Sequence, residues 1–179
     1  MSGAPLHDAP EDLRRPFPVA VLLERRPAAV GRWTTHVWAV TGLVAGDREA
    51  DHEDGPRLIH ERDGVRRYLA SGLRATLHVD ECESYYHNLM TATPRAYVVA
   101  RCDETDDERR PEPFLVSLSF DEAHAYLEAD DEVYAVDIPP ALYRRTEAFV
   151  LAHYVPEKKY KRKRQDWKRQ DQTFRGRAP

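Results

Sequence analysis

Short apolar runs, separated by polar and proline-containing segments, recur along the chain. Between Leu73 and Val79 apolar and polar residues alternate, which is typical of a strand with one buried face. An Asp63-Gly64 step between two other runs is typical of a tight hairpin turn. We expect six or seven strands, drawn from a run that begins at Phe17 and ends at Pro27 and from residues 32–44, 56–60, 66–70, 73–79, 95–102, 113–120 and 133–138.

Three short helices complete the predicted elements. Residues 80–90 suit a helix with Asp80 as its N-cap and Glu83 in the capping-box position, and a second helix follows Ser119. Pro140 suits the first turn of a third helix over residues 141–154. That helix has one apolar stripe, formed by Leu142, Thr146, Phe149, Val150 and His153. Mostly antiparallel strands with helices grouped late in the chain predict an α+β fold, with a curled or barrel-like sheet.

The same pattern divides the chain into three parts. Residues 1–16 are polar and proline-rich and predict a mobile N-terminal arm. Residues 17–155 hold every predicted strand and helix and suit a single α+β domain, and residues 156–179 form a basic tail. No run approaches the ~18 apolar residues of a membrane-spanning helix. The N-terminus also lacks the apolar core of a secretory signal, so we expect a cytoplasmic protein without a membrane span.

Charge is distributed unevenly between these parts. The formal net charge is -4, yet residues 157–179 carry ten Lys and Arg against three Asp and Glu, a balance of +7. The rest of the chain carries 17 basic and 28 acidic side chains, a balance of -11. An acidic body would not hold a nucleic-acid backbone, whereas the tail has the charge to do so.

The tail also carries aromatic residues at a regular interval. Tyr160, Trp167 and Phe174 are seven residues apart, which would place them on one face of a helix. Because Trp, Tyr and Arg are typical anchors of protein interfaces, we predict that this segment binds a protein partner. RNA or DNA phosphates, an anionic membrane surface and a merely solvating tail are the alternatives. The basic residues around the aromatic ones are Lys161, Arg162, Lys163, Arg164, Lys168 and Arg169.

Candidate metal-binding residues are few. His78, Cys82 and His87 are of ligating types, but their spacing matches no established zinc pattern. Cys102 or Asp80 could complete such a site only through folding, and whether these residues bind a metal stays open.

The sequence also shows no motif that is typical of a catalytic site. Cys82 lies between two glutamates, which would raise the pKa of its thiol, and Cys102 precedes an aspartate, so neither thiol has an activating neighbour. The sequence contains no G-x-S-x-G motif of a serine hydrolase, no G-x-x-x-x-G-K-[ST] phosphate-binding loop and no G-x-G-x-x-G dinucleotide-binding motif. We therefore expect no catalytic residue and no cofactor. An enzyme that uses the region between His78 and His87 is a third hypothesis.

Several short segments, taken in order, resemble a known family. They are VAVLLERRP, RWTTHVWAVTGLV, LRATLHVDECESYYHNL, PRAYVVARCD, RPEPFLVSLSFDEAHAYLEADDEVYAVDIPP and AFVLAHYVPEKKYKRKR. Over residues 17–165 the chain resembles a bacterial family of domains of unknown function, whose genes commonly lie beside those of molybdenum-dependent formate dehydrogenases. The resemblance implies a non-catalytic accessory protein or small subunit of such a system. It implies a partner that is the molybdoenzyme or its iron–sulfur subunit, and no catalytic residue transfers with it. A nucleic-acid-binding regulator that acts through the basic tail is the alternative.

Overall fold

The computed structural model describes residues 12–30, 33–46, 55–102, 109–127 and 131–156. This part of the chain has the predicted α+β composition, with seven strands and three short α-helices. The elements are η1 (Asp12–Arg14), β1 (Phe17–Val30), β2 (Trp33–Ala45), β3 (Arg57–Arg62), β4 (Val65–Ala75), η2 (Val79–Glu81), α1 (Cys82–Leu89), β5 (Arg95–Cys102), β6 (Pro111–Ser117), α2 (Phe120–Leu127), β7 (Glu132–Asp137) and α3 (Pro140–His153).

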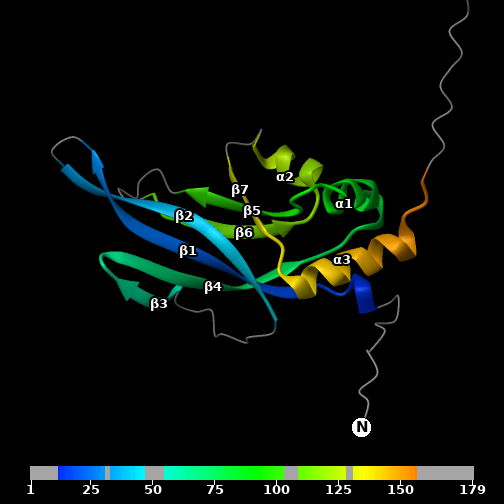
Figure 1. The fold of residues 1–179 in the computed structure, drawn as a ribbon, viewed down its shortest axis with the longest axis horizontal. Helices are drawn as coiled ribbons and strands as arrows, with labels where there is room; N and C mark the ends of the chain where they lie inside the picture. Colours follow the sequence, from blue (N-terminus) through cyan, green and yellow to red (C-terminus); the bar gives the residue numbers. More distant parts are fainter. Residues whose placement is uncertain (1–11, 31–32, 47–54, 103–108, 128–130, 157–179) are drawn as a thin grey trace, which may run out of the picture.

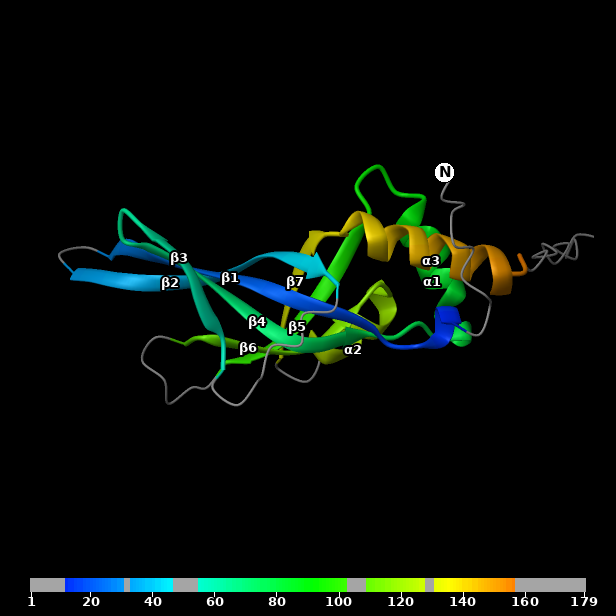
Figure 2. The ribbon, with the colours of Figure 1, turned by 90° about the horizontal axis from the view of Figure 1, so that it is seen from below.

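The strands form one mostly antiparallel sheet in the order β2-β1-β4-β6-β5-β7, with β3 added to the first part of β4. The sheet curls until β2 contacts β7, which confirms the predicted barrel-like shape. The two halves of the sheet meet where β4 and β6 run parallel, at the pair Ala75 and Val116. Figures 1 and 2 show the β1–β2 and β3–β4 hairpins reaching away from the end of the sheet where α1 and α3 lie.

The core lies inside this curl and beneath α1 and α3. Alternate residues of β1 point into it, and Val21 and Leu23 are fully buried. On α3 four of the five residues of the predicted stripe are buried, Leu142, Thr146, Phe149 and Val150, and the fifth, His153, is half-buried against Phe149. Burying side chains of this size stabilises the fold by about 1.5–3 kcal/mol each. Pro140 opens α3 as predicted, where its missing N–H is tolerated.

One long strand replaces two predicted ones. Val65–Ala75 is continuous, whereas the sequence pattern predicts separate strands over residues 66–70 and 73–79. The interruption in the pattern is a β-bulge: Val19 pairs with Leu73 and Val21 with Ala70, so β4 contains one residue more than β1 between these pairs. Gly72 has a φ of 86°, which suits a glycine in the bulge. The strand then ends at Ala75, before residues 76–79.

Other predicted boundaries shift for local reasons. β1 continues through Pro27 to Val30, because β4 no longer pairs with β1 beyond Arg25 and a proline is tolerated where one strand edge is unpaired. The strand predicted over residues 113–120 runs from 111 to 117 instead. Phe120 therefore begins α2, which confirms the helix predicted to follow Ser119, rather than ending β6.

The N-terminal end of the folded part also differs from the sequence pattern. Residues 12–14 form a 3-10 helix whose Leu13 is buried in the core, so the folded part begins earlier than Phe17. The Arg145 guanidinium donates to the backbone oxygen of Arg15 at 2.9 Å and fixes this segment against α3. The rest of the predicted arm and the tail from residue 157 lie outside the described residues.

Candidate functional site

The predicted partner-binding residues lie outside the described part of the chain, but the segment leading to them is placed. α3 ends at His153. The ring of Tyr154 then stacks on Tyr86 of α1, with ring centroids 4.8 Å apart and an angle of 21° between the rings. The tail therefore starts beside α1. Tyr160, the basic run from Lys161 to Arg164, Trp167, Lys168, Arg169 and Phe174 follow beyond residue 156.

A depression of about 730 Å³ lies between α1 and the start of α2. Phe120 and Tyr97 form its aromatic part, with ring centroids 5.8 Å apart, and the Phe120 side chain is 53% exposed. Burial raises the pKa of Tyr97 further above physiological pH, so this side chain adds no negative charge to the depression. The remaining lining residues are polar or acidic: Asp80, Glu81, Glu83, Ser84, His87, Asn88, Thr91, Thr93 and Asp121.

A hydrogen-bond network centred on the fully buried Ser119 holds the two walls of this depression together. The Ser119 hydroxyl donates to the Glu81 carboxylate at 2.6 Å and lies 3.0 Å from the hydroxyl of Ser84. It also accepts the backbone N–H of Glu122 at 3.1 Å, which makes it the N-cap of α2. The Ser117 hydroxyl accepts the N–H of Ser119 at 3.0 Å and donates to the Glu122 carboxylate at 2.5 Å. In a simple capping box the Glu122 carboxylate would accept the backbone N–H of Ser119 directly; here the Ser117 hydroxyl lies between the two and bonds to both.

Asn88 fixes the other end of α1. Its side-chain amide donates to the backbone oxygens of Arg95, at 2.7 Å, and Leu118, at 2.8 Å. Its side-chain oxygen accepts the N–H of Arg95 at 3.0 Å. Asn88 is buried, so these bonds replace the water that its amide loses on folding. Together with Ser119 it makes the depression a rigid surface.

The chemistry of the depression suits positively charged groups. Glu83 is 59% exposed at its side chain, and Asp80 and Asp121 are exposed on the same surface. His87 lies 3.6 Å from the Glu83 carboxylate. A Lys or Arg side chain here would gain charge-assisted hydrogen bonds from the carboxylates and a cation–π contact with Phe120.

Sequence reasoning missed the residues that shape this surface. For Ser119 a signal existed, because Ser119 and Glu122 have the spacing of a capping box. The prediction of Asp80 as the N-cap of this helix is wrong, because α1 begins at Cys82. Its N-cap is Glu81, whose side chain makes no capping hydrogen bond. Asn88 gave no local signal, because its partners lie on other elements.

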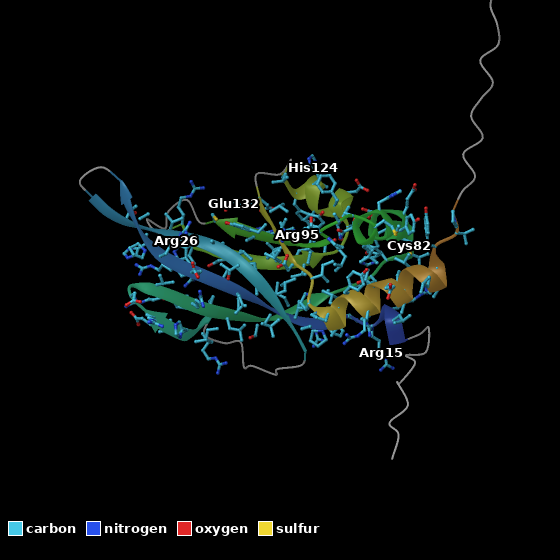
Figure 3. The ribbon with its side chains drawn as sticks, viewed as in Figure 1. Arg15, Arg26, Cys82, Arg95, His124 and Glu132 are labelled. Carbon is cyan, nitrogen blue, oxygen red and sulfur yellow. The ribbon has the colours of Figure 1, made fainter. Side chains whose placement is uncertain are left out.

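The suggested metal ligands do not come together. Cys82 is 3% exposed in the core, and its sulfur lies 4.0 Å from the backbone oxygen of His78, while the exposed His87 lines the depression. The Cys102 side chain forms a hydrogen bond with Glu132, and Figure 3 shows Glu132 well separated from Cys82. Cys102 is therefore not placed to join Cys82 in a metal site. Within the described ranges, no group of three or more His, Cys, Asp or Glu side chains is arranged to hold a metal ion.

Both cysteine thiols have a raised pKa, which disfavours the reactive thiolate form. Burial, followed by hydrogen bonding and charge from Glu132, raises the pKa of Cys102 to about 11. Burial, followed by the charge of Asp80, raises the pKa of Cys82. The predicted direction for Cys82 is thus confirmed, but the main cause is burial rather than its glutamate neighbours. Tyr134, whose hydroxyl also donates to Glu132, completes this second polar cluster.

Apolar side chains are also exposed around α2. Leu127 ends the helix with 47% of its surface exposed. On the neighbouring strand Phe114 packs edge-on against Tyr126, with ring centroids 5.7 Å apart. The Arg101 guanidinium carbon lies 4.3 Å from the centre of the Phe114 ring. We refer to Phe114, Phe120, Tyr126 and Leu127 as the α2 surface; such exposed aromatic and apolar groups mark interaction surfaces.

Comparison with known proteins gives one match. A family model described as "Protein of unknown function (DUF3305)" matches residues 18–163, which agrees with the predicted resemblance to a family of unknown function. Nothing in the match links the chain to formate dehydrogenase genes. No curated protein and no solved structure matches the chain. None of the helices in the described part of the chain is long and apolar enough to cross a membrane.

Proposed function

We propose that this chain, which belongs to the DUF3305 family of proteins of unknown function, is a non-catalytic accessory protein that binds a protein partner in the cytoplasm. The observation that carries the proposal is the exposed aromatic character of the α2 surface, above all Phe120, which is 53% exposed. Aromatic side chains are enriched at protein interfaces, where they bury a large apolar area at a small cost in side-chain entropy.

The partner that we propose is a molybdenum-dependent formate dehydrogenase or its iron–sulfur subunit. The support is the resemblance over residues 17–165, taken with a basic, aromatic tail that suits an acidic surface on the partner. In this proposal the chain docks partly through Tyr160, Trp167 and Phe174, and the surrounding Lys and Arg residues steer the approach. It is a small subunit or an assembly factor of the redox system.

Purification of the native protein at low salt, followed by identification of whatever elutes with it, tests this proposal. We expect a large molybdoenzyme or its iron–sulfur subunit in the eluate. Recovery of no redox protein would contradict the proposed partner. A chain that carries Phe120→Asp should recover less partner than one that carries Glu61→Gln, a neutralising change on the exposed strand β3.

The mode of binding is tested by two tail variants. Trp167→Ala should weaken the complex by 2 kcal/mol or more, because a buried Trp anchor commonly costs about that much on truncation. Lys163→Ala should cost at most about 1 kcal/mol, as expected for an exposed charge. Salt should lower the association rate and leave the formed complex largely intact. The opposite order, with Trp167→Ala silent and moderate salt dissolving the complex, would indicate a purely electrostatic tail.

Nucleic-acid binding is the second candidate, and the balance of +7 over residues 157–179 is the observation in its favour. Binding to duplex DNA would weaken with salt with a slope of about -0.9 per phosphate contacted. A filter-binding titration at two salt concentrations measures that slope. Negligible binding at low salt would remove this candidate.

A further inference from the structure

We propose that the depression between α1 and α2 is the docking surface for the chain's own basic segment, residues 157–169. The depression is open and rigid, and its walls are joined by the bonds of Ser119 and Asn88. A docking surface that is preformed in this way loses little conformational entropy when it is occupied. The occupant would be a part of this chain that lies outside the described residues.

The depression and residues 157–169 are complementary in charge, and both carry aromatic side chains. Asp80, Glu83 and Asp121 supply exposed carboxylates around the partly exposed ring of Phe120. The segment supplies Lys158, Lys159, Lys161, Arg162, Lys163, Arg164, Lys168 and Arg169, with Tyr160 and Trp167 among them. Lys and Arg can pair with the carboxylates, and an Arg or an aromatic ring can pack on Phe120.

The place where the chain leaves the fold makes this docking intramolecular. Tyr154 is held against Tyr86, and Tyr86 belongs to the helix whose Glu83, Ser84 and His87 line the depression. An eight-residue helix such as α1 is about 12 Å long. A few extended residues after Pro156, at about 3.3 Å each, therefore suffice to reach any point along it.

Covalent linkage also explains why weak contacts are enough. A short flexible linker holds a segment at an effective concentration in the millimolar range. Exposed ion pairs of up to about 1 kcal/mol each, together with packing on Phe120, can then keep the segment docked, and competition or salt can break them. If the tail also binds the proposed partner, the partner must first displace it from α1 and α2. This consequence rests on the proposed function, whereas the docking itself does not.

Zero-length carbodiimide cross-linking of the isolated full-length chain tests the docking, because it joins lysine amines only to carboxylates in direct contact. Mapped at low salt, the lysines between Lys158 and Lys168 should link to Asp80, Glu83 and Asp121. Links to the exposed Glu61 and Glu112, on other surfaces, should be at least fivefold fewer. The preferred links should fall at least fivefold at 0.5 M salt. Links spread evenly over all exposed carboxylates would overturn the proposal.

Two further measurements remove the remaining explanations. A mixture of isotopically light and heavy chains should give links within one chain only, and mixed links would overturn intramolecular docking in favour of a second copy. Phe120→Ala should reduce the links at least threefold, whereas Phe114→Ala should leave them unchanged, because Phe114 packs against Tyr126 near the other end of α2 and does not line the depression. Unchanged thermal melts show that both variants are folded, and equal link patterns in the two would contradict docking on Phe120. Because no partner is present, a failure of the proposed function leaves these results unaffected.

Discussion

The hydroxyl of Ser119 donates to the carboxylate of Glu81 at 2.6 Å, across 38 residues of sequence. This short, charge-assisted bond ties the N-terminus of α2 to the turn before α1. The same oxygen caps α2 by accepting the N–H of Glu122. One buried side chain therefore serves as a helix cap and as a link between two helices.

Replacing Ser119 by alanine removes both roles. We expect Ser119→Ala to lower the free energy of unfolding by about 2–3 kcal/mol, because a lost N-cap costs about 1 kcal/mol and a buried polar group without its partner costs about 1–3 kcal/mol. Urea denaturation measures the change. Thr93→Ala, at an exposed position on the rim of the same depression, should stay within about 0.5 kcal/mol. A loss in Ser119→Ala that also stays within about 0.5 kcal/mol would contradict the stabilising role of the Ser119 bonds.

A second prediction concerns the Asn88 side-chain amide, which donates two hydrogen bonds to backbone oxygens. Asn88→Asp replaces the donating amide by a carboxylate facing the carbonyl oxygens of Arg95 and Leu118. At pH 7 this variant should be less stable than Asn88→Ala, because a buried charge beside two acceptors costs more than a missing side chain. Burial beside these acceptors should raise the pKa of the new carboxyl above the ordinary Asp value of about 3.9, so protonation should narrow the gap as the pH falls toward that value. Denaturant melts at pH 7 and pH 4.5 compare the two variants, and an Asp variant that is the more stable at pH 7 would contradict the assigned bonds.

The pKa of Cys102, raised to about 11, sets the pH dependence of its alkylation. An ordinary thiol titrates near pH 8.5, so Cys102 should carry on the order of 100-fold less thiolate at pH 8. Peptide-resolved labelling with iodoacetamide should therefore keep rising in rate above pH 10. Glu132→Gln should lower this pKa and accelerate labelling at pH 8. A profile that levels off near pH 9 would contradict the role of burial and Glu132.

The same shift has a consequence for stability. Because the folded-state pKa of Cys102 lies above the unfolded value, its contribution to stability is complete below about pH 8.5. That contribution is lost as the pH rises through about 11. Cys102→Ser should flatten this part of the pH–stability curve.

Ending the chain at Val155 should leave the body folded. All described helices and strands lie before this residue, and the core is formed by residues of these elements and their connections. The tail should contribute less than about 1 kcal/mol, because exposed ion pairs are individually weak. Thermal melts of the full-length and shortened chains should nearly coincide. A loss of more than about 3 kcal/mol would mean that the tail is an integral part of the core.

Much of the fold follows from local patterns, and the errors have local causes. The stripe on α3 is readable because the spacing of Leu142, Thr146 and Phe149 depends only on the helix itself. The division of β4 into two strands was wrong because the bulge at Gly72 shifts the alternation by one residue. Alternation alone cannot tell such a shift from a break.

The candidate surface was much less predictable. Asn88 and Leu118 are 30 residues apart, and only the packing of α1 beside the end of β6 brings them into contact. The exposure of Phe120 is equally a tertiary property, since the sequence pattern places this residue both at the end of a predicted strand and at the start of a predicted helix. The tail could be found from sequence because its charge and aromatic spacing are properties of the chain itself.

The junction between the two halves of the sheet has a consequence for the order of folding. Each side of it contains a local hairpin, β1 with β2 and β5 with β6, whereas β1 also pairs with β4 across a long stretch of sequence. The halves are joined by the parallel pair Ala75 and Val116, which are far apart in sequence. Closing a long loop is slow compared with forming a hairpin, so the β1–β2 and β5–β6 hairpins should gain protection against amide hydrogen exchange before the β1–β4 and β4–β6 pairs form. The β4–β6 junction, where Ala75 and Val116 form the one residue pair of the described strands, is then where the curled sheet would first reopen.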